Sequence, residues 1–597
     1  MKKIINIATI AVFALLLSSC ESFLDSTNYW SKSADNFPGN VEDAEQMITG
    51  IYNNLNVAIG DNCHLNYFLW SNAASDDCLG GGGNNDQAMQ AEDLMLNFGA
   101  DMYDSFYTNR YKGIARANLA IETLESCGVD ENTLKQYMGE AYFLRAFFMY
   151  ELGSMFGNIP YPTASTADPT LPQVSGEELW GQVLQDLKRA ADMMPAKAQK
   201  GSGHVDKYCA EALLGRVYLF YSGMYSDENV TMPEDGELTK AEVGAYITDC
   251  VNNSGYELVS DYHNLWAYTN RCTVEDDLSP FKGNDYSWAE NDAKINPEAM
   301  FMIKFNTQPS WSTTIGYSNQ QALFCGVRQE DMGAEQMFPF GQGWGMCQVS
   351  PQLVADWKAA EPTDPRREAS IIAVNSAYAD KGGVKALANG TKSYNFGKAS
   401  FVQETGYYLT KTMPVVARKE DSSSFWASFS NAMHTLTWSS GNEDNFQLNS
   451  INDHVLIRFA EVLLMDAELN NNQASFDKVR SRAGLASKPI NEENIRNERR
   501  WELAFEGVRF NDLRRYGESY AAAALDKQEG VACWNVGIEG TNTASKYNGG
   551  YGNRYKATKG FVSIPSKEIS LSANAGAEYK FTQNEGWGTA DSQYAGW

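Results

Sequence analysis

The sequence predicts a mostly helical protein in which paired helices stack into a solenoid and carry an irregular, loop-rich lobe with a few short strands. One observation is a recurrent amphipathic run, written EAYFLRAF, EALLGRVY and EVLLMDAE, that begins at Glu140, Glu211 and Glu461. Glu140 and Glu211 lie 71 positions apart, close to two tetratricopeptide units of roughly 34 residues. The other is the loss of helical periodicity between 256 and 450. We therefore predict a tetratricopeptide-like solenoid, because such repeats bury their apolar faces only by stacking.

Length and charge narrow the class of ligand. The chain has 597 residues, 43% of them hydrophobic and 12% aromatic, which is enough apolar surface for a large core. Its formal net charge is -27, and the acidic residues are spread along the chain. Such a surface repels phosphate backbones, so the composition argues against a nucleic-acid partner and favours neutral or polar ligands.

The first residues have the pattern of a processed leader. Lys2 and Lys3 precede a short apolar run, which ends at Leu17-Ser18-Ser19-Cys20. This ending resembles a lipobox, so we predict a lipoprotein signal peptide over 1–20 and lipid attachment at Cys20. The polar, turn-rich residues 21–40 are predicted to be a tether, and no later run is long and apolar enough to span a membrane.

The region 41–255 is predicted to form the amino-terminal helical part. Apolar residues recur at helical spacing over Val41 to Asn56, and Leu179 to Met194 forms a second helical pattern that Pro195 closes. Between these helices, Asn62 to Asn85 is rich in Asn, Asp, Ser and Gly. We expect this stretch to be a long loop.

The region 256–450 is predicted to be the irregular lobe. Gly, Asn, Pro, Trp and Tyr are frequent there, and the short apolar run Ala299 to Phe305 is typical of an isolated strand. Helices are expected to resume at His454, and 451–597 is predicted to pack on the solenoid as helices and a tail. Long loops on a rigid scaffold are where binding residues usually lie.

The run from Asn494 to Gly517 combines paired charge with apolar rows at helical spacing, and it predicts one helix that is contacted on more than one side. Glu498, Glu502 and Glu506 lie four apart, so arginines must separate them. Because arginines are interspersed with these glutamates, we interpret the run as a structural clamp of buried ion pairs rather than as a catalytic carboxylate site.

Aromatic and amide side chains in the predicted loops are candidates for binding a sugar. The C–H face of a pyranose stacks on Trp or Tyr, and Asn, Asp or Arg hydrogen-bond its hydroxyls. Taken singly, each aromatic residue is more often part of the core, but as a group in glycine-rich loops these residues are better candidates for exposure. The candidate ligand-binding residues are Trp70, Asp76, Asn84, Asn85, Tyr286, Trp288, Trp311, Tyr317, Arg328 and Trp344.

Catalysis and cofactor binding have weaker signals. A glycoside hydrolase needs two acids on opposite sides of the scissile bond, whereas Asp76 and Asp77, like Glu275 to Asp277, are adjacent in sequence. These clusters are interpreted as solvated loop charge or a structural calcium site. The sequence has no HExxH, GxSxG or phosphate-binding glycine motif. We therefore predict a protein that is not an enzyme and holds no cofactor.

Motifs spread along the chain resemble one known family. ERRWELAFEGVRFNDLRRYG, ending at Gly517, is its carboxy-terminal signature. C-x3-LD at Cys20, YKGIARANLAI, GEAYFLRAFFMYELGSMFGNIPY, LIRFAEVLLMDAEL, VRSRAGL, IPSKEISLSANAG and QNEGW follow the same family order. Together these motifs resemble the SusD/RagB family, the surface glycan-binding lipoproteins of Bacteroidetes outer membranes. The proline that often follows the early LD is absent, which puts only the tether in doubt.

The resemblance implies a location, a partner and a ligand. A SusD-like protein would be lipid-anchored at the cell outer membrane and exposed at the surface. It would cover a SusC-like TonB-dependent transporter and deliver oligosaccharides to it, with a glycan face built from loops of the early segment and of the middle lobe. Two alternatives stay open: a RagB-like protein that captures peptides, and a surface glycoside hydrolase.

Overall fold

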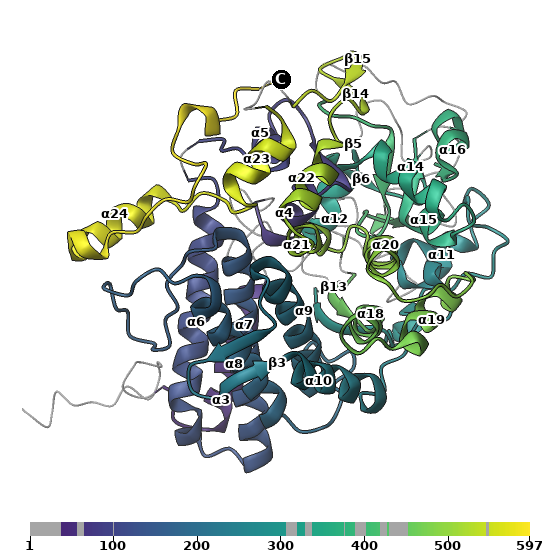
Figure 1. Ribbon diagram of the computed structural model, residues 1–597. Coiled ribbons are helices and arrows are strands. Elements are labelled where there is room, and N and C mark those ends of the chain that lie inside the picture. The colour runs from purple at the N-terminus through teal and green to yellow at the C-terminus, as the bar shows by residue number, and fades with distance from the viewer. Residues whose placement is uncertain are drawn as a thin grey trace, which may run out of the picture.

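The computed structural model describes residues 37–55, 65–99, 101–305, 319–328, 337–374, 376–387, 401–417, 427–428, 450, 452–544 and 549–596. Within these residues the chain is mostly helical, and its strands are short (Figure 1). The predicted leader over 1–20, Cys20 and most of the predicted tether lie outside this part. Each helix of the described part is too short or too polar to cross a membrane.

The amino-terminal helices stand side by side, each packed on the next, and form the predicted solenoid (Figure 1). Small residues allow the close packing: a Cβ at Gly139 would overlap Met194, and one at Gly153 would lie 3.1 Å from Leu179. The predicted helix over 179–194 is confirmed as part of α8. These helices are α3 (Val41–Tyr52), α6 (Asp104–Thr123), α7 (Glu131–Phe156), α8 (Gly176–Met193), α9 (Lys207–Tyr225) and α10 (Lys240–Asn253).

The carboxy-terminal helices extend the same stack, because α10 packs directly on α18. The expectation that helices resume at His454 is corrected: the strand β13 (His454–Arg458) comes first and pairs antiparallel with β4 (Ala299–Ile303). This pair joins the lobe to the solenoid. The later helices are α18 (Phe459–Asn470), α19 (Gln473–Arg482), α20 (Glu492–Leu503), α21 (Arg509–Arg515), α22 (Glu518–Asp526), α23 (Tyr551–Thr558) and α24 (Ser566–Ala575).

The lobe is built from short elements joined by loops, as predicted. Its helices are α11 (Arg271–Val274), α12 (Gln320–Cys325), α14 (Pro351–Ala360), α15 (Pro365–Ser370) and α16 (Ser376–Gly382). Its strands are β5 (Val327–Arg328), β6 (Gln342–Gly343), β7 (Met346–Val349), β8 (Ile371–Ala373), β9 (Lys385–Ala386), β10 (Tyr407–Leu409), β11 (Val416–Ala417) and β12 (Ala427–Ser428). Two hairpins lie outside the lobe: β2 (Asn229–Met232) with β3 (Gly236–Thr239), and β14 (Ala532–Asn535) with β15 (Ile538–Thr541).

Two predicted elements differ from the structure. The early loop over 62–85 contains the helix α4 (Tyr67–Ala73) and the strand β1 (Cys78–Gly81), and the helix α5 (Gln87–Asp93) follows it. The predicted single helix over 494–517 is broken between α20 and α21, where Phe505 and Gly507 have φ of 65° and 74°. The two segments contact each other in the structure. Ser71 and Asn72 of α4 donate hydrogen bonds to the carbonyl oxygens of Gly507 (2.8 Å) and Phe505 (3.3 Å), which satisfies the backbone at the break.

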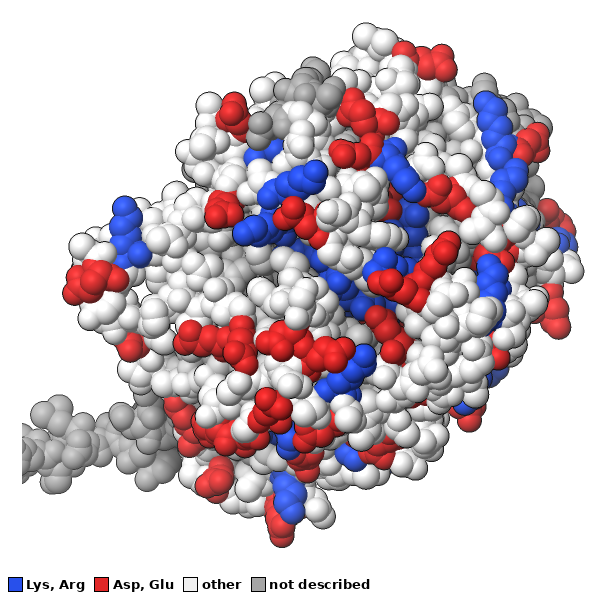
Figure 2. Space-filling view, in the orientation of Figure 1, with Lys and Arg blue, Asp and Glu red and all other residues white. Residues whose placement is uncertain are grey.

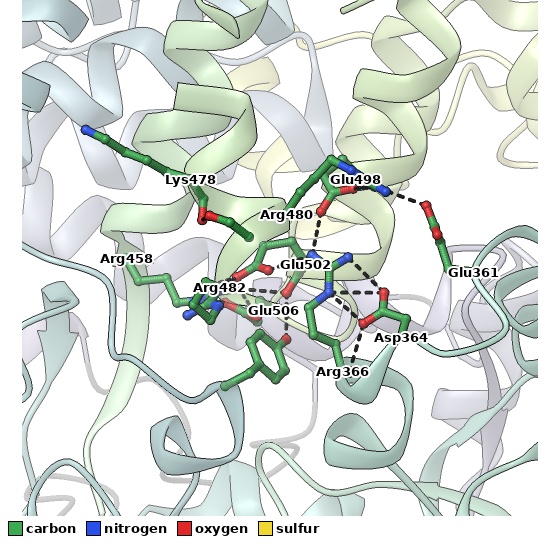
Figure 3. A network of polar contacts seen from close by, with 12 residues as sticks. Glu361, Asp364, Arg366, Arg458, Lys478, Arg480, Arg482, Glu498, Glu502 and Glu506 are labelled. Atoms are coloured by element: carbon green, nitrogen blue, oxygen red, sulfur yellow. Dashed lines mark hydrogen bonds and ion pairs between the residues drawn. The ribbon is translucent and has the colours of Figure 1, made fainter. Parts of the chain in front are cut away.

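A buried ionic network surrounds α20 (Figure 3). The Glu502 carboxylate accepts hydrogen bonds from Arg366 (2.8 Å), Arg458 (2.5 Å) and Arg482. Burial alone would raise the pKa of Glu502, but these three guanidinium groups outweigh it and hold the pKa well below its usual value. The predicted clamp of buried ion pairs is therefore confirmed, and it ties α20 to β13, α15 and α19.

Candidate functional site

The prediction that Trp70 and Asp76 bind a ligand is wrong, because both side chains are buried. The Trp70 side chain is 1% exposed and packs edge to face on Phe510, with 5.2 Å between ring centroids. Asp76 is 4% exposed and pairs with Arg509 (2.7 Å) and Arg500 (3.0 Å), which together overcome the effect of burial and hold its pKa below the ordinary value. Trp70 is therefore a core residue and Asp76 a structural anion, because both lie beneath the surface beside α20 and α21.

The two aromatic residues predicted near 286 pack within their own part of the lobe. The ring of Tyr286 is half-buried and stacks on His263, with 4.3 Å between centroids. Trp288 is 6% exposed and, with Trp266 and Lys411, lines a small cavity of about 50 Å³. A cavity of this size has no room for a sugar ring. Trp311 and Tyr317 lie outside the described residues.

The remaining four predicted residues come together on one surface. The strand β1 pairs antiparallel with β7, with Gly81 opposite Met346, so the early loop and the middle lobe meet there. The exposed Asn84 and Asn85 follow β1, and the half-buried Trp344 lies two residues before β7. We name the residues Asn84, Asn85, Asp86, Arg328 and Trp344 the Asn84–Trp344 surface.

Glycines make this meeting of segments possible. Gly81 and Gly82 both have positive φ, at 70° and 80°, and a Cβ on Gly81 would lie 2.6 Å from the carbonyl oxygen of Gly345. A Cβ on Gly83 would lie 2.7 Å from Nη2 of Arg328. The glycine run over 80–83 is therefore needed for close approach to the lobe and to the Arg328 guanidinium.

Arg328 joins the two halves of the surface. Its Nη1 donates to Oδ2 of Asp86 (2.8 Å) and to the carbonyl oxygen of Trp344 (3.2 Å), and the guanidinium carbon lies 5.8 Å from the centre of the Phe401 ring. The same Asp86 oxygen accepts from the backbone N–H of Gly83 (2.6 Å). One carboxylate thus orients both the early loop and the arginine.

A buried polar layer supports the surface from behind. Gln90 Nε2 donates to the carbonyl oxygens of Gly81 (3.3 Å) and Gly83 (2.9 Å), and Gly81 N–H donates to Oε1 of Gln403 (3.0 Å). Gln403 in turn donates to Asp93 (2.5 Å). Burial raises the pKa of Asp93 to about 7, and the hydrogen bonds from Gln403 and Tyr551 only partly counter it.

Sequence reasoning missed several of these supporting residues. Asp86, Gln90, Phe401 and Gln403 carry no motif of their own. For Asp86 the sequence held only a general signal, because aspartate is a frequent turn residue that hydrogen-bonds nearby backbone. The partners from 401–403 had no such signal, since they meet the early loop only through the tertiary fold.

The Asn84–Trp344 surface carries side chains of the kinds that can bind a neutral, hydroxylated ligand. Two exposed side-chain amides offer donors and acceptors, the Arg328–Asp86 pair has little net charge, and Trp344 offers an indole packed on Phe324 with 5.3 Å between centroids. In the described part of the chain, no group of three or more His, Cys, Asp or Glu side chains is arranged to hold a metal ion.

Two family models match this chain. One, described as "Starch-binding associating with outer membrane", matches residues 22–219, and the other, described as "SusD family", matches residues 301–587. A SusD-like protein P2 from Formosa agariphila is 24% identical over 538 residues, which cover 85% of this chain and 90% of the relative.

Solved structures share the fold. A laminarin-binding SusD-like protein has a TM-score of 0.64 and 24% identity, over 92% of this chain and 100% of that chain. Surface glycan-binding protein A from Bacteroides fluxus has a TM-score of 0.66 at 24% identity, with the same coverage of both chains. The protein of that name from Bacteroides thetaiotaomicron, in complex with laminarihexaose, has a TM-score of 0.63 at 18% identity, over 91% of this chain and 99% of that chain.

Proposed function

This chain belongs to the SusD/RagB family, and from that premise we propose that it is a surface lipoprotein that captures oligosaccharides and delivers them to a SusC-like TonB-dependent transporter. The observation that carries the proposal is the Asn84–Trp344 surface, where an early loop and the middle lobe present amides and an indole together. Lipid attachment at Cys20 would hold the protein at the outer membrane.

The proposed mechanism is binding and release, with no bond made or broken. Trp344 would stack on a sugar ring, and Asn84, Asn85 and Arg328 would hydrogen-bond its hydroxyls. Trp311 and Tyr317, which lie outside the described residues, stay proposed glycan-binding residues. The adjacent acids Asp76 and Asp77 are poorly suited to hydrolysis, because Arg500 and Arg509 already neutralise Asp76.

The binding test uses the soluble protein without residues 1–20. Laminarihexaose is the first probe in calorimetry, because related structures bind laminarin or this hexasaccharide, and a glycan array broadens the search. We expect Trp344→Ala to weaken binding at least tenfold. Tyr246→Ala, which removes a half-buried aromatic ring from α10, is the matched control and should bind as the unmodified protein does.

Three results would redirect the proposal. Equal affinity of Trp344→Ala and the unmodified protein would remove the site assignment. Binding of peptides in preference to every oligosaccharide would make the protein a peptide-capturing relative. Release of new reducing ends from a polysaccharide over hours, abolished by an Asp76→Asn or Asp277→Asn change, would restore the hydrolase alternative.

A further inference from the structure

The Asn84–Trp344 surface is continued by a lobe segment, residues 401–404, that lies against the glycines after β1. Gly83 forms an antiparallel bridge with Phe401, and the N–H of Val402 donates to the carbonyl oxygen of Gly82 (3.1 Å). Backbone groups paired in this way join neighbouring strands of a sheet. The surface therefore continues beyond the early loop.

The same segment pairs in turn with the hairpin β14–β15. The N–H of Trp534 donates to the carbonyl oxygen of Glu404 (2.9 Å), and the N–H of Glu404 donates to that of Trp534 (3.0 Å). The N–H of Val536 donates to the carbonyl oxygen of Phe401 (2.7 Å). Backbone hydrogen bonds thus run from β7 through β1 and the 401–404 segment to β14 and β15. Because neighbouring strands lie about 4.8 Å apart, β15 is about 14 Å from the glycines after β1.

Gln403 couples the hairpin to the early loop. Its side chain is completely buried, and its φ is 50°. Its N–H donates to Oδ1 of Asn535 on β14 (2.8 Å), while its Oε1 accepts from the N–H of Gly81 (3.0 Å). A positive φ in a residue other than glycine is strained, and it persists only where surrounding contacts hold it. The position of the hairpin is therefore fixed relative to the Asn84–Trp344 surface.

The tip of the hairpin presents aliphatic side chains to solvent. Asn535 pairs with Ile538, so Val536 and Gly537 form a two-residue turn, with φ of 49° and 83°. Asparagine is the usual residue at the first position of such a turn, and a β-branched residue is strained there. Val536 is nonetheless 39% exposed, and Ile538 is 71% exposed. Strain and exposed aliphatic groups at one turn indicate a binding role rather than a role in folding.

The hairpin surface has the chemistry of a sugar contact. Figure 1 shows β14 and β15 at the top of the molecule next to β5, the strand that contains Arg328. In the same orientation, Figure 2 shows mainly uncharged side chains there. Trp534 on β14 is half-buried. An indole and aliphatic side chains can pack on the apolar face of a sugar ring, and a surface with few charges suits a neutral ligand.

We propose that the hairpin β14–β15 is a second contact region of the same glycan site, where Trp534, Val536 and Ile538 contact sugar units beyond those held by Trp344. A single sugar ring cannot reach both regions. The protein would therefore bind a neutral oligosaccharide of several units in preference to a short one, and the hairpin would determine this preference. The proposal rests on the proposed function, because it takes the Asn84–Trp344 surface as the first contact region.

The experiment compares two chain lengths. Calorimetry measures the affinity of the soluble protein without residues 1–20 for laminaritriose and for laminarihexaose. We expect the unmodified protein to bind the hexasaccharide at least tenfold more tightly than the trisaccharide. Trp534→Ala should lower the affinity for the hexasaccharide about tenfold and Ile538→Asp severalfold, and both variants should bind the trisaccharide as the unmodified protein does. Trp344→Ala should weaken the binding of both sugars.

The control is Leu571→Asp, which alters an aliphatic side chain that is 50% exposed on α24, on another side of the molecule in Figure 1. It should leave both affinities unchanged. Ile538→Asp changes a side chain at an exposed turn, so its result does not depend on how well Trp534→Ala folds. Unchanged affinity of both hairpin variants for laminarihexaose, while Trp344→Ala still weakens binding, would overturn this proposal alone. Failure of the unmodified protein to bind any oligosaccharide would overturn the proposed function as well.

Discussion

The ionic network around α20 and the Asn84–Trp344 surface are built from the same kinds of side chain but differ in exposure. In the network, Glu502 is fully buried and held by three arginines from three other elements. On the surface, one arginine pairs with one aspartate at 2.8 Å, and exposed amides lie beside them. The charged groups of the network bond mainly to one another and hold the fold together, whereas the surface leaves side-chain amides exposed to solvent.

The comparison teaches that charge content does not identify a functional site. The stretch richest in charge, 494–517, is structural because its neighbours neutralise it in a dry interior, where an isolated charge would be very unfavourable. The site proposed to bind a ligand has few charges and owes its position to glycines and a strand pair.

The largest effect on stability is expected from a substitution that breaks the ionic network. Glu502→Gln leaves Arg366, Arg458 and Arg482 buried without their shared carboxylate, so we expect a loss of about 3–5 kcal/mol in the free energy of unfolding. Urea unfolding measures it. The control Glu492→Gln removes an exposed carboxylate that pairs with Arg496 one turn along α20, and should have little effect. Equal losses in both variants would show that burial is not what makes the network important.

The next largest effect is expected in the pH dependence of stability, where a buried carboxylate without an arginine partner, Asp93, differs from one held by arginines. The folded-state pKa of Asp93, about 7, lies above its ordinary value of 3.8, so the folded state retains a proton that the unfolded state has lost. Stability should therefore fall as pH rises from about 4 to 7, and Asp93→Asn should raise stability at pH 8 by on the order of 2–4 kcal/mol. Urea unfolding of the unmodified protein and of Asp93→Asn at pH 5 and pH 8 measures both the pH dependence of stability and the effect of the substitution.

The matched variant for that prediction is Asp512→Asn. Arg499 (2.9 Å) and Arg515 (2.7 Å) outweigh the effect of burial and lower the pKa of Asp512 to about 2. Its contribution to stability is present above pH 4 and is lost as pH falls toward 2, so Asp512→Asn should destabilise the protein at both pH 5 and pH 8. A stabilising Asp512→Asn change, or a destabilising Asp93→Asn change at pH 8, would contradict the distinction between paired and unpaired carboxylates.

A smaller effect is expected at the binding surface itself. Asp86→Asn removes the charge that orients Arg328 but keeps an oxygen for the N–H of Gly83. We expect about a tenfold loss of glycan affinity, equivalent to about 1.4 kcal/mol, with a nearly unchanged melting temperature. Calorimetry and thermal unfolding on the same sample measure the two quantities. A drop in stability as large as that of Glu502→Gln would mean that this pair belongs to the scaffold.

The smallest effect is expected at an exposed amide. Asn84→Ala removes one hydrogen-bonding side chain that is not needed for folding, so glycan affinity should fall a fewfold and unfolding should not change. The control Asn253→Ala removes an exposed amide on α10 and should leave glycan affinity unchanged. Equal affinities of the Asn84 and Asn253 variants would remove the early loop from the site.

Sequence alone determined the helical architecture, because amphipathic periodicity and small residues are local properties. The runs at Glu140, Glu211 and Glu461 all lie in helices, and the run over 299–305 contains a strand. The sequence also predicted Asn84, Asn85, Arg328 and Trp344 as candidates, and the family resemblance implied that loops of the early segment and of the middle lobe would lie together.

Only the tertiary structure decided which candidates are open to a ligand. Asp76 finds its partner Arg509 433 positions away, and Trp70 packs on Phe510 across a similar separation. The break between α20 and α21 likewise depends on hydrogen bonds from α4. Burial is set by residues distant along the chain. An Asp therefore becomes a structural ion where arginines enclose it, and a Trp becomes a core residue where other rings cover it, whereas either could bind a ligand at the surface.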